Sequence, residues 1–257
     1  LPAPTIDAEG QPYQASVMIT TPFFHISATH AGIMLAILFG LKVVILYKWD
    51  ARRAVELIER EKVSRFACVP TMSAELIRAA EEMNCKMESL RTIDSGGAKR
   101  PASQVEDIAR HVPHAMPGTG FGMTESGGVG IGMRGDVYLK HPHAAGRLQP
   151  PLLEMRIVDE EDKQLPDGEV GELVIKSVCN MRCYLNKPEE TSRALRDGWL
   201  YTGDLAKVDE NEIITIVDRK KDMIIRGGEN ISASEIQAEL LRHPEILEAA
   251  AFSVPDD

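Results

Sequence analysis

Residues 120–128 read GFGMTESGG, a stretch in which glycines surround an aromatic ring, hydroxyls and a carboxylate. Glycine has no Cβ, so the backbone at such positions can approach a flat ligand closely. Phe121 offers a ring that can stack on a base, Thr124 a hydroxyl for a phosphate oxygen, and Glu125 a hard oxygen ligand for Mg²⁺. The same residues could instead only turn the chain, with Glu125 capping the next helix. The stretch leaves both interpretations open, and the segments around it decide between them.

The segment before this stretch alternates between strand-like and helix-like patterns from residue 16 to residue 121. Asp50 is placed to cap one of the expected helices. The buried face of that helix is expected to contain Ala54, Val55, Leu57 and Ile58. The expected strands include residues 42–46, 65–69 and 90–93, with helices after them, among them residues 71–83. Such repetition predicts an α/β fold with a parallel sheet and helices on its faces.

The pattern changes near residue 146. Short alternating segments there predict strands separated by turns, with one helix at residues 188–195 between them. The expected strands are residues 153–158, 169–176, 200–208 and 212–217. We therefore expect a smaller β-rich subdomain, a distorted barrel.

A third pattern follows the sequence DRKKD at residues 218–222. A strand and a glycine turn precede a capping box that starts at Ser232 and reaches Glu235. A helix to His243-Pro244 and a strand at residues 246–254 should follow. Because this unit is too short to close its own core, we expect an internal fragment, cut at the start of a small α+β C-terminal domain. The expected domains are residues 1–145, 146–220 and 221–257.

The composition predicts an ordinary soluble chain. Its 257 residues carry a formal net charge of −10, and 44% of them are hydrophobic. No run of Lys and Arg is long enough to follow a phosphate backbone, which argues against nucleic acid as a partner. The most apolar stretch, residues 31–46, is shorter than the roughly 20 residues of a membrane span. It predicts a buried helix that leads into a buried strand.

The first residues and the cysteines indicate in which cellular compartment the protein lies. Residues 1–14 have neither the basic start nor the apolar core of a signal peptide. The four cysteines predict reduced thiols in a cytoplasmic protein. Cys179 and Cys183 form a pair, but neither a second pair nor a nearby histidine completes a zinc site.

Several candidate site residues follow strands. Ligands of α/β sheets bind beyond the carboxyl ends of the strands. The segments in such places are Ser95-Gly96-Gly97-Ala98, residues 118–122, and His25 after the strand expected at residues 17–20. In the β-rich part, a carboxylate such as Asp204 can accept bonds from both ribose hydroxyls, and Arg219 can reach the sugar or a phosphate. The alternative interpretation is that Asp204 and Arg219 form an ordinary ion pair at the surface.

Taken together, these motifs resemble the adenylate-forming acyl-CoA synthetases, a superfamily that includes firefly luciferase and peptide-synthetase adenylation domains. GFGMTES at residues 120–126 resembles the family's Gly-aromatic-Gly-x-Thr-Glu motif. SGGA at residues 95–98 resembles its adenine-wall loop, and PFFHIS at residues 22–27 its aromatic-His gate. Residues 201–237, from YTGD to SEIQ, resemble the signature that crosses into the mobile C-terminal domain. The motifs occur in the family's order from residue 16 onward.

The resemblance implies a role for each matching residue. Nucleotide-binding residues would be Gly96, Gly97, Ala98, Gly120, Phe121, Gly122, Thr124, Asp204 and Arg219. Thr124, Glu125 and His25 would serve catalysis, with Glu125 holding Mg²⁺ and His25 bordering the acyl carboxylate. Lys221 would be the hinge, and Gly227 and Gly228 would line the pantetheine tunnel for CoA.

The implied reaction activates a carboxylic acid. Coupling the acid to AMP, with release of pyrophosphate from ATP, supplies the leaving group that a carboxylate lacks. CoA then displaces AMP to give a thioester, and Mg²⁺ offsets the charge of the reacting anions. The family's phosphate loop and its C-terminal lysine are absent from these residues, so this fragment alone is expected to be inactive.

The expected substrate is an uncharged fatty or aryl acid. The candidate pocket wall is apolar and comprises Ala31, Gly32, Met34, Leu35, Met72 and Met123. Thr29 stands where some long-chain enzymes carry a gating tryptophan, which argues against a strictly long-chain acid. The alternatives are an amino-acid-activating domain that loads a carrier protein, and a non-catalytic nucleotide-binding derivative of the fold. A homodimer is a further expectation.

Overall fold

The computed structural model describes residues 5–6, 10, 12–128, 130–149, 153–226, 229–241, 243, 245–246 and 249–254. Its backbone divides into two units, Leu1–Gly146 and Arg147–Asp257. The three-part division expected from the sequence stays a prediction. In the part of the chain that is described, no helix is long and apolar enough to cross a membrane.

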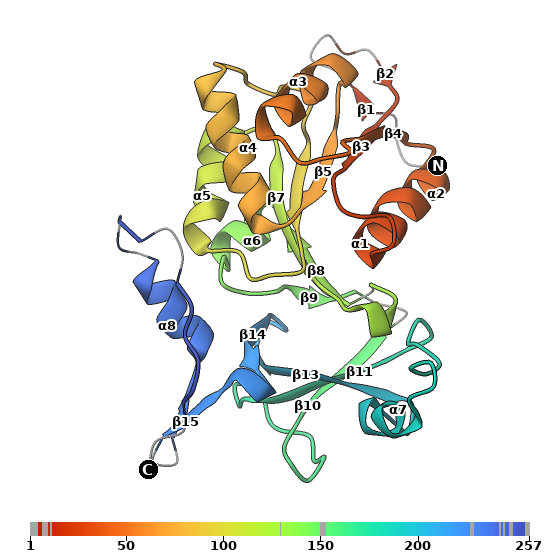
Figure 1. Ribbon diagram of the computed structural model, residues 1–257, viewed down its shortest axis with the longest axis vertical. Coiled ribbons are helices and arrows are strands. Elements are labelled where there is room, and N and C mark those ends of the chain that lie inside the picture. Colours follow the sequence, from red (N-terminus) through yellow and green to blue (C-terminus); the bar gives the residue numbers. More distant parts are fainter. Residues whose placement is uncertain are drawn as a thin grey trace. The chain divides into compact units, whose positions relative to one another are not determined.

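The sheet of the first unit has the strand order β4-β3-β5-β6-β7-β8 (Figure 1). Neighbouring strands are parallel except for β7 and β8, which are antiparallel. These strands are β3 (Ser16–Ile19), β4 (Lys42–Ile45), β5 (Arg65–Cys68), β6 (Thr92–Ser95), β7 (Met116–Phe121) and β8 (Ile131–Arg134). A separate antiparallel pair comprises β1 (Thr5–Ile6) and β2 (Pro12–Tyr13). The predicted parallel α/β sheet is confirmed.

Helices connect the parallel strands, and α3, α4 and α5 lie side by side against the sheet (Figure 1). The helices of this unit are α1 (Ile26–Ala28), the π-helix η1 (Thr29–Met34), α2 (Leu35–Phe39), α3 (Ala51–Glu61), α4 (Pro70–Glu82), α5 (Ala102–His111) and α6 (Asp136–Lys140). Asp50 caps α3 as predicted, because its carboxylate accepts the N–H of Arg53 at 2.9 Å. The buried face of α3 is the predicted one, Ala54, Val55, Leu57 and Ile58. It packs into a core with Phe66 of β5 and Leu76 of α4.

The apolar stretch at residues 31–46 corrects one expectation. It does form a helix that leads into a strand, with Gly40 ending α2 at a positive φ of 64°. The helix is not buried, however, since Ile37 is 77% and Leu38 is 68% exposed. The strand is only partly buried, because Val44 is 7% exposed but Ile45 is 55% exposed. Hydrophobicity reports which side chains favour burial, but it does not say that a neighbouring segment is present to cover them.

The second unit carries an antiparallel sheet with the order β10-β11-β13-β12, and β14 pairs with β13. Its strands are β10 (Leu153–Val158), β11 (Gly171–Ser177), β12 (Leu195–Arg196), β13 (Trp199–Val208) and β14 (Ile214–Arg219). The short β9 (Arg147–Leu148) begins the unit, and α7 (Pro188–Ala194) is the helix expected between strands. The predicted β-rich part is confirmed.

The end of the chain is only partly as expected. After the 3-10 turn η3 (Lys220–Asp222), β15 (Ile224–Arg226) pairs with β16 (Glu229–Ile231). Helix α8 (Ala233–Leu240) follows, and Ser232 caps it by accepting the N–H of Glu235 at 3.2 Å. The strand expected at residues 246–254 is wrong for residues 249–254, which are irregular. Phe252 is 74% exposed there, and a strand needs a partner for its backbone groups as well as an apolar sequence.

Candidate functional site

The glycine-rich stretch is a tight connection between two antiparallel strands. β7 ends at Phe121, one 3-10 turn, η2 (Thr124–Ser126), follows, and the chain returns in β8. The buried Ser126 hydroxyl accepts the N–H of Met123 at 3.2 Å and donates to its carbonyl at 3.0 Å. A Cβ on Gly122 would lie 2.8 Å from the carbonyl oxygen of Gly128. The loop therefore folds back on itself so closely that only glycine fits at residue 122.

The three segments expected at one edge of the sheet are neighbours. They follow β3, β6 and β7, whose carboxyl ends point the same way because the strands from β3 to β7 are parallel. A Cβ on Gly96 would lie 3.4 Å from the carbonyl oxygen of Gly120. A Cβ on Gly128 would lie 3.2 Å from Ile26, the residue after His25. The first unit thus gathers the adenine-loop, glycine-loop and histidine candidates at one edge.

His25 begins helix α1. Its Nδ1 accepts the N–H of Ser27 at 3.2 Å and lies 2.8 Å from the Ser27 hydroxyl oxygen. In the neutral ring this assigns the proton to Nε2. The side chain is exposed, as is Thr124, whereas Glu125 is half-buried.

In the second unit, Asp204 and Arg219 are directly opposite in the pairing of β13 and β14. Arg219 Nε lies 3.5 Å from Asp204 Oδ1, with side-chain exposures of 63% and 11%. Burial raises the pKa of the Asp204 carboxyl above its usual range. Arg219 opposes this rise in pKa, while the charges of Glu172 and Asp218 add to it. The predicted ribose pair is therefore a nearly buried carboxylate beside an accessible guanidinium.

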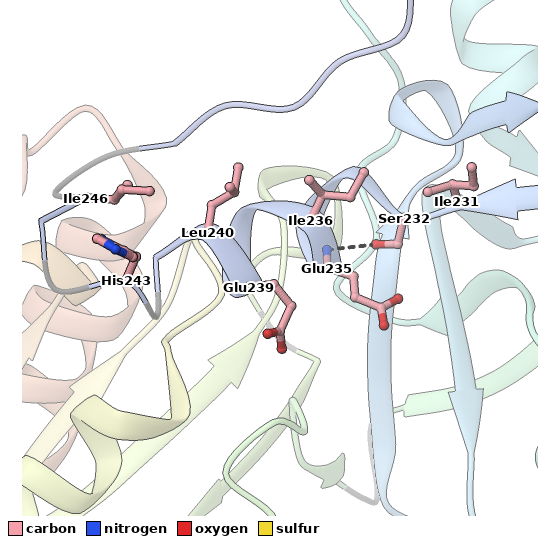
Figure 2. A pocket seen from close by; sticks show the side chains of 8 residues that line it. All are labelled: Ile231, Ser232, Glu235, Ile236, Glu239, Leu240, His243 and Ile246. Carbon is pink, nitrogen blue, oxygen red and sulfur yellow. Dashed lines mark hydrogen bonds between the residues drawn. The ribbon is translucent and has the colours of Figure 1, made fainter.

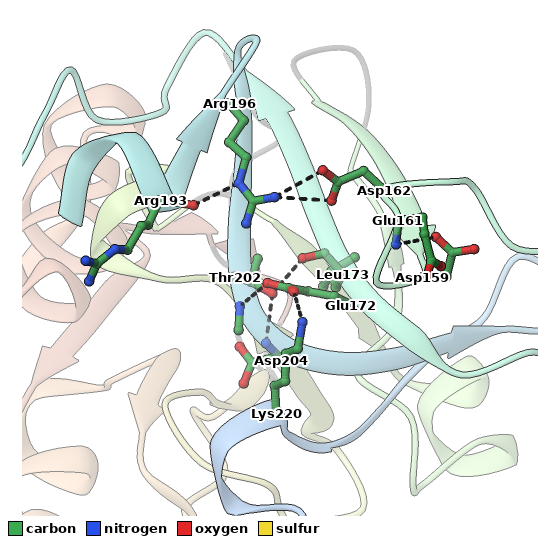
Figure 3. A network of polar contacts seen from close by, with 11 residues as sticks. Asp159, Glu161, Asp162, Glu172, Leu173, Arg193, Arg196, Thr202, Asp204 and Lys220 are labelled. Atoms are coloured by element: carbon green, nitrogen blue, oxygen red, sulfur yellow. Dashed lines mark hydrogen bonds and ion pairs between the residues drawn. The ribbon is translucent and has the colours of Figure 1, made fainter. Parts of the chain in front are cut away.

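A polar network around Asp204 was not predicted from the sequence (Figure 3). The Thr202 hydroxyl donates to the carbonyl of Leu173 at 2.7 Å and accepts the N–H of Asp204 at 3.1 Å. Glu172 accepts the N–H of Gly203 at 3.1 Å and pairs with Lys220 at 3.0 Å. The only sequence signal for this network is that Thr202 and Gly203 belong to the YTGD motif.

The proposed hinge residue Lys221 lies exposed in η3, at the end of β14. Asp218, which lies before Lys221 in β14, binds the start of α8. Its Oδ2 accepts a hydrogen bond from the Ser232 hydroxyl at 2.8 Å and one from the N–H of Ser234 at 3.0 Å. Burial acts to raise the pKa of Asp218, but these hydrogen bonds, with that from the N–H of Arg219, hold it below its usual range. The predicted tunnel residues Gly227 and Gly228 lie outside the described residues.

Two open hollows lie in the second unit. One, of about 640 Å³, runs along α8, where Ile236 and Leu240 line it together with Glu235 and Glu239 (Figure 2). The other, of about 530 Å³, lies between α7 and the Tyr201–Gly203 segment, with Glu172 on its wall. Neither of these two hollows is lined by the glycine loop.

Arg100, just after the adenine-loop candidate, is a further unexpected feature. It is 3% exposed, and its Nη1 donates to the carbonyl of Gly118 at 3.2 Å. Among the described residues, its Nε and Nη2 have no hydrogen-bond partner. Burial lowers the pKa of this guanidinium, and nearby Tyr138, Cys68 and Asp94 partly restore it.

Metal-binding groups are sparse. Within the described ranges, no three His, Cys, Asp or Glu side chains gather in a way that could hold an ion. The four cysteines are free thiols, and Cys68 is buried enough that its pKa rises to about 12. Glu125 is the acidic side chain that the glycine loop offers to a cation, so a cation there would need its other ligands from bound phosphates or water.

Comparison with known proteins gives consistent matches. A family model described as AMP-binding enzyme matches residues 4–185. The chain is 33% identical over 248 residues to 4-coumarate–CoA ligase 4 of Arabidopsis thaliana, which covers 94% of this chain and 43% of the relative. It is 32% identical over 246 residues to feruloyl-CoA synthase of an Amycolatopsis species, which covers 93% of this chain and 48% of the relative.

A solved structure matches as well. The o-succinylbenzoate CoA synthetase of Bacillus subtilis, in complex with its acyl-adenylate intermediate, superposes with a TM-score of 0.87 at 29% identity. The match covers 96% of this chain and 50% of that one. The chain therefore spans about half the length of the relatives it matches.

Proposed function

Because this chain belongs to the family of AMP-binding enzymes, we propose that the whole protein is an AMP-forming acid–CoA ligase. It would join a carboxylic acid to the AMP moiety of ATP and pass the acyl group to CoA as a thioester. The names of the relatives support this proposal, since the 4-coumarate, feruloyl and o-succinylbenzoate enzymes are named as a CoA ligase, a CoA synthase and a CoA synthetase. A cytoplasmic location and a homodimer remain part of the proposal.

The observation that carries the proposal is the sheet edge of the first unit. Gly96 lies against Gly120, and Ile26 lies against Gly128, so three loops meet where an α/β sheet binds ligands. Backbone that can be approached this closely suits the flat face of a base.

Each candidate residue then has a proposed task. Gly96, Gly97, Ala98 and Phe121, with Gly120 and Gly122 beside them, would hold adenine. Asp204 and Arg219 would bind the ribose, and the carboxylate would accept hydrogen bonds from the ribose hydroxyl groups. Thr124 would donate to a phosphate oxygen, and His25, with its proton on Nε2, would face the acid's carboxylate.

Glu125 would hold Mg²⁺ through a half-buried carboxylate oxygen. When bound, the cation would offset the charge that the acid and the triphosphate bring together. Lys221 would be the hinge, and Gly227 with Gly228 the tunnel for CoA.

The proposed acid is uncharged and either aryl or fatty. The wall assigned to it (Ala31, Gly32, Met34, Leu35, Met72 and Met123) offers apolar surface, and a Cβ on Gly32 would lie 2.7 Å from the Cδ1 of Ile19, whose side chain would have to shift. All three of the similar proteins described above are named for aromatic acids, which favours an aryl substrate. An amino-acid-adenylating domain and a non-catalytic nucleotide-binding protein remain the alternatives.

The test is a screen of the whole protein for acid-dependent release of AMP. The panel would contain 4-coumaric, ferulic and o-succinylbenzoic acids, medium-chain fatty acids and amino acids, with CoA thioester as the second readout. We expect thioester from an uncharged aryl or fatty acid, and a loss of about 10²–10³-fold in adenylation for Glu125→Gln. Glu160→Gln, on an exposed loop of the second unit, is the matched control and should keep the full rate.

Activation of amino acids alone would overturn the proposal in favour of a carrier-loading domain. Nucleotide binding without AMP release from any acid would favour the non-catalytic alternative. A Glu125→Gln variant as fast as the control at limiting Mg²⁺ would remove the metal role from this residue.

A further inference from the structure

Glu172, on β11, uses both carboxylate oxygens to join two segments that are far away in the sequence (Figure 3). Oε1 accepts the N–H of Gly203 at 3.1 Å, across 31 residues of chain. Oε2 pairs with Lys220 Nζ at 3.0 Å, across 48 residues. The Glu172 side chain is 11% exposed and the Lys220 side chain is 49% exposed, and both contacts of Glu172 are charge-assisted.

The first contact holds an irregular backbone. Gly203 has a positive φ of 73°, and the pairing of β11 with β13 slips between Glu172 and Val174. The N–H of Gly203 is therefore bound by the side chain of Glu172 rather than by a main-chain carbonyl of the neighbouring strand. Because Asp204 follows directly, the direction of its carboxylate depends on this peptide.

The second contact reaches the start of η3. Lys220 is the residue before the proposed hinge Lys221, and its side chain is 49% exposed while its ammonium binds Glu172. A shift of the backbone at η3 would pull on Lys220, and through Glu172 on Gly203.

We propose that Glu172 is a positioning residue: it fixes the Gly203–Asp204 peptide for nucleotide binding and ties it, through Lys220, to the segment that leads to the hinge. This inference rests on the proposed ribose role of Asp204. One side chain, that of Glu172, would then fix both the direction of the Asp204 carboxylate and the position of Lys220, the residue before the hinge.

The charges around Asp204 make this role measurable. Facing its carboxylate are Arg219 and Asp218 from β14 and Glu172 from β11, with Lys220 of η3 bound to Glu172. Glu172 raises the pKa of Asp204, and Lys220 neutralises part of the Glu172 charge. Glu172→Gln should therefore lower the pKa of Asp204, whereas Lys220→Met should raise it. Loss of structure would instead move the pKa of Asp204 in both variants toward that of a free aspartate.

The first experiment uses this 257-residue chain. The Asp204 carboxyl is titrated by carbon NMR, with Asp204→Asn to assign the signal, and hydrogen exchange is measured at the Gly203 amide. Glu172→Ala should speed that exchange by at least about tenfold, while Glu172→Gln, which keeps an acceptor oxygen, should stay within about threefold. Lys207→Met removes an exposed lysine from the same strand as Asp204 and should change neither readout.

The second experiment uses the whole protein. Glu172→Ala should raise KM for ATP by about tenfold, with a much smaller change in KM for CoA. Shifts of the same sign in the two charge variants, or unchanged Gly203 exchange in Glu172→Ala, would overturn the positioning role. The Asp204 carboxyl signal is also followed as AMP is added. If AMP does not change that signal while the titration and exchange results hold, the ribose assignment is wrong and the link through Glu172 stands.

Discussion

The glycine loop at residues 120–128 and the bend at residues 201–204 are both irregular, but different forces hold them. Gly122 is required because main chain lies 2.8 Å from where its Cβ would be. At Gly203 a Cβ would meet nothing within 4 Å, and the bend is held by Glu172 and Thr202 instead. One region is therefore sensitive to added atoms, and the other to lost charge and hydrogen bonds.

The largest expected effect separates the two glycines. Gly122→Ala forces main chain apart and should lower the free energy of unfolding of the first unit by about 2–3 kcal/mol. Gly203→Ala adds a methyl group into open space and should cost only about 1 kcal/mol in the second unit, for its positive φ. Denaturant unfolding with one probe in each unit measures both. Equal losses of stability would mean that crowding by the main chain does not distinguish Gly122 from Gly203.

An intermediate effect is expected at Asp218, whose hydrogen bonds anchor the start of α8. Asp218→Asn keeps an acceptor but loses the charge, and should lower stability by about 1–2 kcal/mol at neutral pH. Since the folded pKa lies below the usual value, this contribution is present above the unfolded pKa and is lost as pH falls through the folded pKa.

Unfolding of the wild type and of Asp218→Asn at a series of pH values tests this. The gap between the two curves should close in the acid range. The control is Asp167→Asn, at an exposed aspartate, and its curve should follow the wild type throughout. A gap that stays constant down to low pH would show that the charge of Asp218 contributes nothing.

The smallest expected effect has the opposite sign and concerns Asp204. Its folded pKa is raised, so its contribution is present below the unfolded pKa and is lost as pH rises through the folded pKa. Asp204→Asn should therefore stabilise the chain by about 1 kcal/mol at neutral pH, as expected for a group held against a desolvation cost. The same pH series measures it. A destabilised Asp204→Asn would mean that the pair with Arg219 outweighs the burial.

Much of the local structure could be predicted because its causes lie within a few residues. Asp50 caps α3 three residues away, and Ser232 caps α8 in the same way. The alternation of strands and helices before residue 121 led to a parallel sheet, and that sheet brings His25, Gly96 and the glycine loop to one edge. The order of the motifs led to the family of AMP-binding enzymes.

Other expectations failed where the outcome depended on distant neighbours. The sequence predicted a buried helix within residues 31–46 and a strand at residues 246–254. The structure has Ile37 and Phe252 exposed, because apolar character does not supply the segment that would cover it. The burial of Arg100, two of whose nitrogens have no hydrogen-bond partner within the described ranges, also has no sequence signal.

The sequence by itself therefore determined the caps of α3 and α8, the two kinds of sheet and the motif residues at the strand ends. Only the tertiary structure decided that Glu172 reaches Gly203 and Lys220, across 31 and 48 residues. Caps and turns arise from interactions between residues a few positions apart, which a sequence displays directly. The link through Glu172 depends on a register shift between β11 and β13, and the register of paired strands is set by packing over the whole sheet.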